Sequence, residues 1–193
     1  MIDQMMVSLV RKLSDEDMIN ENMSAKYTYA LITLVEKWLT LGTLLIAGIF
    51  FQNVLPMVLF LFVFFTLRNR TGGYHAEKFW QCYVMTVLTF LGITWIGPVL
   101  SENFTAVYAA VLLSAVIILV IGTVNHPNMD MNNEELIESK KTARWMVILY
   151  SFLILAFAVL GVNTLYLSYM SVGIVLCAML LCIAKVMKQE VGS

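Results

Sequence analysis

Long runs of apolar residues constrain this sequence more than any other feature. One of them extends from Phe104 to Val124 without a charged residue. A helix needs about 20 such residues to cross the hydrocarbon core of a bilayer. Only 13% of the 193 residues are charged, against about 25% in an average soluble domain. Because the runs do not alternate between apolar and polar residues, they do not fit the strands of a membrane barrel. The sequence therefore predicts an all-α fold, a polytopic integral membrane helix bundle.

About six membrane-spanning segments follow from the apolar runs and from the turn residues between them. The expected spans are 38–51, 54–67, 83–100, 104–124, 145–162 and 164–184, with turns at Gln52-Asn53, at 101–103 and at Asn163. The third span is expected to close at Gly97-Pro98, since proline interrupts a helix. A polar loop is expected over 125–144.

The N-terminal region has a different pattern from the spans. Its apolar residues recur at helical spacing, which predicts an amphipathic helix; they are Ile2, Met5, Met6, Leu9, Val10 and Leu13. Such a helix either lies in the membrane interface or packs on the protein's own bundle. We expect residues 1–37 to form this amphipathic and juxtamembrane region, and 38–193 to form a single transmembrane domain.

The basic residues predict the orientation of the chain in the membrane. All 12 Lys and Arg residues fall in four groups, and the expected turns at 52–53, 101–103 and 163 contain none; the groups are Arg11, Lys12, Lys26 and Lys37, then Arg68, Arg70 and Lys78, then Lys140, Lys141 and Arg144, then Lys185 and Lys188. Cytoplasmic loops of membrane proteins are enriched in Lys and Arg. Both termini, the segment 68–82 and the loop 125–144 are therefore expected in the cytoplasm of a multi-pass cell-membrane protein. The net charge of -1 gives no indication of nucleic-acid binding.

The segment 68–82 carries the reactive side chains. His75 and Cys82 are seven positions apart in it. On one continuous helix they would be separated by about 10.5 Å along the axis, whereas a nucleophile and its base need about 3 Å. The pair Gly72-Gly73 disfavours such a helix. We expect the helix to begin near Ala76, with His75 in a loop that folds back toward the cysteine.

This arrangement predicts the chemistry of a cysteine peptidase. His75 would accept the thiol proton, and the Cys82 thiolate would attack a peptide carbonyl. The basic side chains of Arg68, Arg70 and Lys78 would favour the thiolate and bind a substrate carboxylate, next to the Gly72-Gly73 backbone. The competing interpretation is that one histidine and one cysteine occur together by chance, and that the positive charge serves topology alone. Candidates for a residue that orients the histidine are Asn69, Glu77 and Gln81.

The remaining polar residues have weaker assignments. Lys140 and Lys141 either bind an acidic part of the substrate or lie against an anionic membrane leaflet. His126 has no neighbouring residues at metal-ligand spacing, so it is interpreted as an interfacial loop residue and no metal site is predicted. Cys177 and Cys182 lie in the last span and are expected to be packing residues. No cofactor is assigned.

Two motifs in this sequence resemble the accessory gene regulator B family. The first runs from Arg68 through Gly72-Gly73-Tyr74-His75-Ala76 to Cys82, and the second joins Asn125-His126-Pro127-Asn128 to the basic group that ends at Arg144. The resemblance implies a membrane cysteine endopeptidase that processes a quorum-sensing pro-peptide. It also implies an amphipathic pro-peptide substrate with an acidic tail, a thioester on Cys82, release of a thiolactone or lactone macrocycle, and a homodimer in the lipid bilayer.

Two other function classes remain open on the residues alone. A small peptide exporter would use six spans without peptidase chemistry, but it should have polar groups at mid-membrane depth. An acyltransferase would form a fatty acyl thioester on the same cysteine.

Overall fold

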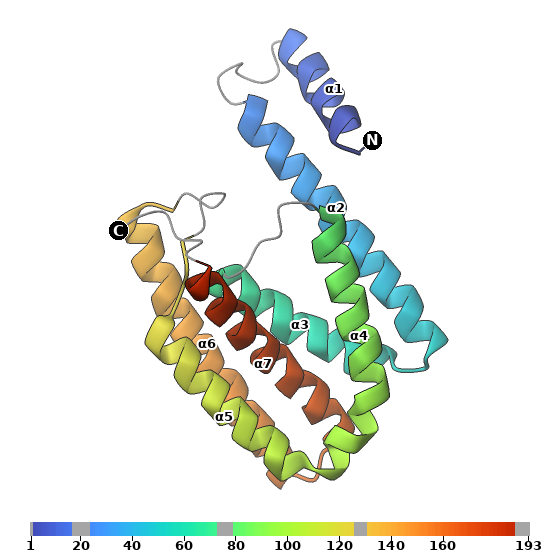
Figure 1. The fold of residues 1–193 in the computed structure, drawn as a ribbon, viewed down its shortest axis with the longest axis vertical. Coiled ribbons are helices and arrows are strands. Elements are labelled where there is room, and N and C mark those ends of the chain that lie inside the picture. The colour runs from blue at the N-terminus through green and yellow to red at the C-terminus, as the bar shows by residue number, and fades with distance from the viewer. Residues whose placement is uncertain (1, 17–23, 73–78, 126–130, 188–193) are drawn as a thin grey trace. The chain divides into compact units, whose positions relative to one another are not determined.

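A computed structural model describes residues 2–16, 24–72, 79–125 and 131–187 (Figure 1). The helices of these residues are α1 (Ile2–Asp15), α2 (Ser24–Phe50), α3 (Val54–Thr71), α4 (Phe79–Glu102), α5 (Phe104–Ile121), α6 (Asn133–Val159) and α7 (Thr164–Val186). The predicted all-α class is confirmed. Within the described residues, five helices are long and apolar enough to cross a membrane, namely α3 to α7. They correspond to the second through sixth expected spans, whereas the first expected span falls in the second half of α2.

The chain divides into two compact units, Met1–Ile46 and Ala47–Ser193. The first unit contains α1 and most of α2. In α1, Met6 and Val10 of the predicted apolar face are buried, whereas Met5 and Leu9 of the same face are exposed. Its location in a membrane interface stays a prediction, as does the domain boundary between residues 37 and 38.

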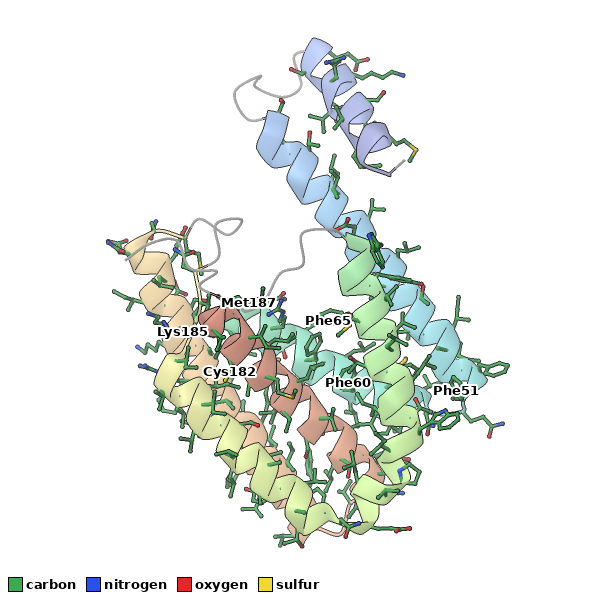
Figure 2. All side chains as sticks on the ribbon, in the orientation of Figure 1. Phe51, Phe60, Phe65, Cys182, Lys185 and Met187 are labelled. Atoms are coloured by element: carbon green, nitrogen blue, oxygen red, sulfur yellow. The ribbon has the colours of Figure 1, made fainter. Side chains whose placement is uncertain are left out.

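Helix α7 is the centre of the second unit and contacts α3, α4, α5 and α6 (Figure 1). It runs in the same direction as α3, since Gly173 lies against the backbone of Phe60 and Phe64 and the Cys177 thiol donates to the Phe64 carbonyl at 3.6 Å. Small residues at such a contact let two helix backbones approach closely. Phe60 itself is buried between the helices (Figure 2).

The predicted end of the third span at Gly97-Pro98 is wrong. Helix α4 continues through Pro98 to Glu102, because proline removes one backbone donor but is tolerated in a membrane helix when its neighbours adjust. Gly97 also fits closely against α7. A Cβ at this position would lie 2.9 Å from Cε2 of Tyr169.

The predicted polar loop over 125–144 is shorter than expected, since α6 begins at Asn133. The Asn132 side chain accepts from the Glu135 N–H at 2.8 Å, and the Asn132 N–H donates to the Glu135 carboxylate at 3.0 Å. This capping box satisfies two donors that a helix start otherwise leaves unpaired. The acidic first turn also complements the helix dipole.

The basic ends of the helices gather at one end of the second unit. Arg68 and Arg70 are in the last turn of α3. Lys185 is in the last turn of α7 (Figure 2), which runs parallel to α3. The turns at Gln52, Asn103 and Asn163 join helices at the opposite end, and they contain no basic residue. This separation agrees with the charge pattern, and the assignment of the basic end to the cytoplasm stays a prediction.

Candidate functional site

Helix α3 ends at the first glycine of the Gly72-Gly73 pair. Gly72 has φ 65° and ψ -127°, a conformation that residues with a Cβ rarely adopt. Its N–H donates to the Arg68 carbonyl at 3.1 Å, and the Arg68 guanidinium donates to the Gly72 carbonyl. Helix α3 thus extends beyond the expected end of the second span at Leu67, and the chain leaves it at a glycine.

The far end of the reactive segment is the beginning of α4. Gln81 and Cys82 belong to this helix, which the structure describes from Phe79 onward. Gly73, His75, Glu77 and the predicted helix start at Ala76 lie outside the described residues, and so do the side chains of Gln81 and Cys82. The pairing of His75 with Cys82 stays a prediction.

The end of α3 is fastened to the residues that follow α5 and to α6. The Arg70 carbonyl accepts two hydrogen bonds, from the Thr123 hydroxyl at 2.8 Å and from the Ser139 hydroxyl at 3.0 Å. The Val124 N–H donates to the Thr71 carbonyl at 3.0 Å, and Gly72 pairs with Val124 in an isolated parallel bridge. We call Arg70, Thr71, Gly72, Thr123, Val124 and Ser139 the clamp.

The clamp joins the two segments that the sequence singles out. From Gly72 the chain continues into residues 73–78, and from Val124 it continues into the second polar segment. Asn125 and Met131, which flank residues 126–130, are hydrogen-bonded to each other. The Asn125 side chain donates to the Met131 carbonyl at 2.9 Å and accepts from the Met131 N–H at 3.1 Å. His126 lies outside the described residues.

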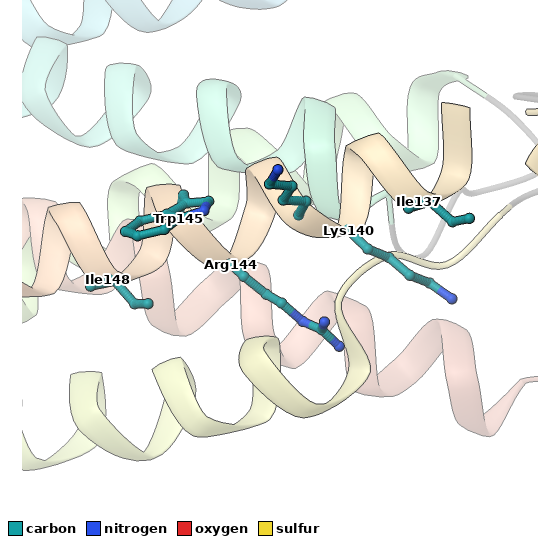
Figure 3. A pocket seen from close by; sticks show the side chains of 6 residues that line it. Ile137, Lys140, Arg144, Trp145 and Ile148 are labelled. Carbon is teal, nitrogen blue, oxygen red and sulfur yellow. The ribbon is translucent and has the colours of Figure 1, made fainter. Parts of the chain in front are cut away.

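A basic pocket of about 420 Å³ lies along α6 (Figure 3). It is lined by Ile137, Lys140, Lys141, Arg144, Trp145 and Ile148. Arg144 extends toward α5, where its Nε donates to the Leu119 carbonyl at 2.9 Å (Figure 3). Three cations beside one indole and two isoleucines suit a ligand that is anionic and partly apolar.

The predicted substrate-binding residues thus fall in two places. Arg68, Arg70 and Gly72 are at the end of α3, and Lys140 and Lys141 are on α6. The two places are close to each other at Gly122, the residue before Thr123 of the clamp. A Cβ on Gly122 would lie 3.0 Å from Cγ of Lys140. Asn69 is exposed at the end of α3.

Sequence reasoning did not find the hydroxyl donors of the clamp or the role of Trp145 in the pocket. Trp145 and Ile148 follow Lys141 at helical spacing, so an earlier start for α6 would have placed them on one face. The described residues contain no group of three His, Cys, Asp or Glu side chains that could hold a metal ion. Cys177 is buried in the bundle and Cys182 is half-buried, and both are free thiols, consistent with packing residues.

The model of one protein family, described as Accessory gene regulator B, matches residues 4–184. The chain belongs to the accessory gene regulator B family. No curated protein and no solved structure matches it. Membership in this family connects the chain with the processing of accessory gene regulator quorum-sensing peptides. With the five apolar helices, it also indicates a multi-pass membrane protein.

Proposed function

We propose that this protein is a membrane cysteine endopeptidase that removes the C-terminal tail of a small signal pro-peptide. The observation that carries the proposal is the family match over residues 4–184, which includes the segment with His75 and Cys82. Two features support it. Cys82 is near the N-terminal end of α4, and a helix N-terminus favours a thiolate. The segment also begins from a fixed point at Gly72, at the basic end of the bundle.

The reaction requires two acyl transfers. His75 accepts the Cys82 proton, the thiolate attacks the peptide carbonyl, and the imidazolium gives its proton to the leaving amine of the tail. The signal peptide then remains as a thioester on Cys82. A Cys or Ser side chain of the peptide attacks this thioester, and its proton returns to the Cys82 sulfur. The product is a thiolactone or lactone ring. Asn69, Glu77 and Gln81 are the candidates for orienting the imidazole.

The basic pocket on α6 supports a binding site for the acidic tail. Lys140 is half-buried and Lys141 is exposed at the pocket, so both can reach a substrate carboxylate beside the exposed side chains of Ile137 and Trp145. We propose that the pro-peptide binds at this end of the bundle, at the surface of the lipid bilayer, and we assign this end to the cytoplasm. We expect the working form to be a homodimer.

Replacement of the nucleophile tests the peptidase function. In cells that co-express the cognate pro-peptide, Cys82→Ala and His75→Ala should each reduce tail removal by about 10³-fold or more, since removing one member of a catalytic unit removes most of its effect. Cys182→Ala is the matched control, because this half-buried free cysteine of α7 is not part of the proposed catalytic pair, and it should retain activity. Wild-type protein trapped with substrate should gain the mass of the peptide on Cys82.

Other outcomes would identify the other function classes. Undiminished cleavage by Cys82→Ala would refute the peptidase. Transport of labelled peptide into vesicles by Cys82→Ala would favour the exporter, and a fatty acyl mass on Cys82 would favour the acyltransferase.

Neutralising the pocket tests the tail site. Lys140→Gln combined with Lys141→Gln should raise KM for the pro-peptide by about 10-fold with little change in kcat, because two charge-assisted contacts are lost in the bound state. A pro-peptide whose tail acids are replaced by amides should bind wild type and variant equally. If KM is unchanged but activity loses its dependence on anionic lipid, the pocket is a lipid site instead.

A further inference from the structure

The Arg70 carbonyl is held more firmly than a helix end requires. The last four carbonyls of a helix have no partner in the helix, and a carbonyl oxygen has two acceptor sites. Both sites of Arg70 are filled, by hydroxyls that come from two different parts of the fold, Thr123 after α5 and Ser139 in α6. Three elements therefore meet at one oxygen atom.

The hydroxyl donors of these bonds come from buried residues, although Arg70 itself is exposed. Thr71 is 0% exposed, Thr123 is 2% exposed and Ser139 is 5% exposed. A buried hydroxyl that loses its acceptor is not readily satisfied by solvent. The Val124–Thr71 bond and the Gly72–Val124 bridge add backbone contacts to the same junction. The end of α3 thus has one favourable position relative to α5 and α6.

The position of this junction limits where the predicted base can lie. His75 follows Gly72 by three residues, and three residues of extended chain span about 10 Å at most. The positive φ of Gly72 fixes the direction in which the chain departs. Catalysis that depends on a close contact loses about 10²-fold for a misplacement of about 1 Å. A small movement of the clamp would therefore affect the reaction.

We infer that Thr123 and Ser139 are positioning residues for the peptidase reaction, which hold the end of α3 so that His75 starts from a fixed point. This inference rests on the proposed function. Neither hydroxyl touches substrate or takes part in proton transfer. They act through the backbone of Arg70, Thr71 and Gly72.

The test uses the full chain in liposomes with its cognate pro-peptide. Thr123→Val and Ser139→Ala each remove one donor and should each lower kcat by about 10-fold, and the double variant by about 100-fold, with KM unchanged. Thr123→Ser and Ser139→Thr keep a hydroxyl and should remain within about 2-fold of wild type. These conservative variants separate loss of the donor from general damage.

A second readout does not depend on turnover. Iodoacetamide should modify Cys82 more slowly in Thr123→Val and Ser139→Ala, with the midpoint of its pH profile moved toward that of His75→Ala, because a misplaced imidazole no longer favours the thiolate. Modification is followed at Cys82 by peptide mass. Ile154→Val is the matched control: this residue is fully buried in α6, and the variant should lower Tm without moving the profile.

The results distinguish the inference from the proposed function. If His75→Ala and Cys82→Ala are inactive but the donor variants keep the wild-type kcat and pH profile, the positioning role is refuted and the peptidase stands. If Cys82→Ala is fully active, the proposed function itself fails. If the donor variants lose activity only in proportion to Tm, as Ile154→Val does, the clamp is structural.

Discussion

Helices α7 and α4 are both apolar enough to cross a membrane, yet α7 is mostly buried among other helices and α4 is mostly exposed. In the most apolar stretch of α7, 61% of the residues are buried, whereas in α4 only 17% are. Ser168, Ser171 and Gly173 of α7 face other helices, while Trp95 of α4 is 81% exposed. In a bilayer the surroundings are as apolar as the core, so hydropathy alone does not separate the two.

The difference in burial indicates which helices of the second unit are tightly packed. Helix α7 joins α3, α5 and α6 into one packed body, and α4 lies at its side with less of its surface covered than any of the other four apolar helices. The predicted nucleophile is on α4, and the starting point of the predicted base is on α3. The reactive segment therefore connects the most tightly packed part of the second unit to α4, the apolar helix with the smallest buried fraction.

The largest expected effect is at the contact between α3 and α7. A Cβ at Gly173 would lie 3.3 Å from the Phe60 carbonyl oxygen and 3.4 Å from the Phe64 nitrogen, and backbone atoms do not yield easily. Gly173→Val should lower the stability by about 3 kcal/mol, the upper part of the range for overpacking, measured by reversible unfolding in detergent. Gly92→Val in α4 is the control, because a Cβ there has nothing within 4 Å. Equal losses from both variants would contradict the contrast between the helices.

A smaller effect is expected when buried volume is removed. Ile174 in α7 is 0% exposed and Ile96 in α4 is 54% exposed. Ile174→Ala should lower the stability by about 2 kcal/mol because it leaves a cavity, whereas Ile96→Ala exchanges contact with lipid and should change it by less than about 0.5 kcal/mol. Thermal shift of the two variants in the same detergent makes the comparison. A larger loss at Ile96 would mean that α4 packs on a surface that its exposure does not indicate.

The smallest effect is expected at hydroxyls that bond within their own helix. Ser171 donates to the Leu167 carbonyl at 2.7 Å in α7, and Thr89 donates to the Met85 carbonyl at 2.7 Å in α4. Such bonds do not hold helices together. Ser171→Ala and Thr89→Ala should each change the stability by less than about 1 kcal/mol, and by similar amounts, in the same unfolding measurement. A marked loss for Ser171→Ala alone would show that its hydroxyl contributes to interhelical packing.

Much of the helical framework could be predicted from the sequence, because bilayer thickness converts apolar runs directly into helices. Gln52-Asn53 and Asn163 mark turns in the sequence and begin or end helices in the structure. The start of α6 differs from the predicted loop, because the charged residues after Asn132 belong to the first turns of a helix, as the capping-box spacing of Asn132 and Glu135 allows. Helix α4 differs from the predicted span end, because a proline near the end of a membrane helix does not have to terminate it.

The clamp could not be predicted from local patterns. Arg70 is 53 positions from Thr123 and 69 positions from Ser139, and a single threonine or serine in an apolar region has many possible partners. The residues of the candidate site were identifiable because their chemistry is unusual in an apolar chain. The clamp residues Thr123 and Ser139 could not be identified in this way, because their contacts with Arg70 depend on how α3, α5 and α6 pack. The pairing of His75 with Cys82 stays a prediction for the experiments above.

The central position of α7 has a consequence for biogenesis. Proteins are synthesised from the N-terminus, so α3 to α6 enter the bilayer before the helix that they surround. Until α7 inserts, the parts of these helices that pack against it, such as Gly97 of α4 and the Phe64 backbone of α3, lack their final neighbours. Packing of the complete bundle then waits for insertion of α7, and nascent chains that stop before it should be recognised by membrane quality control as unassembled proteins.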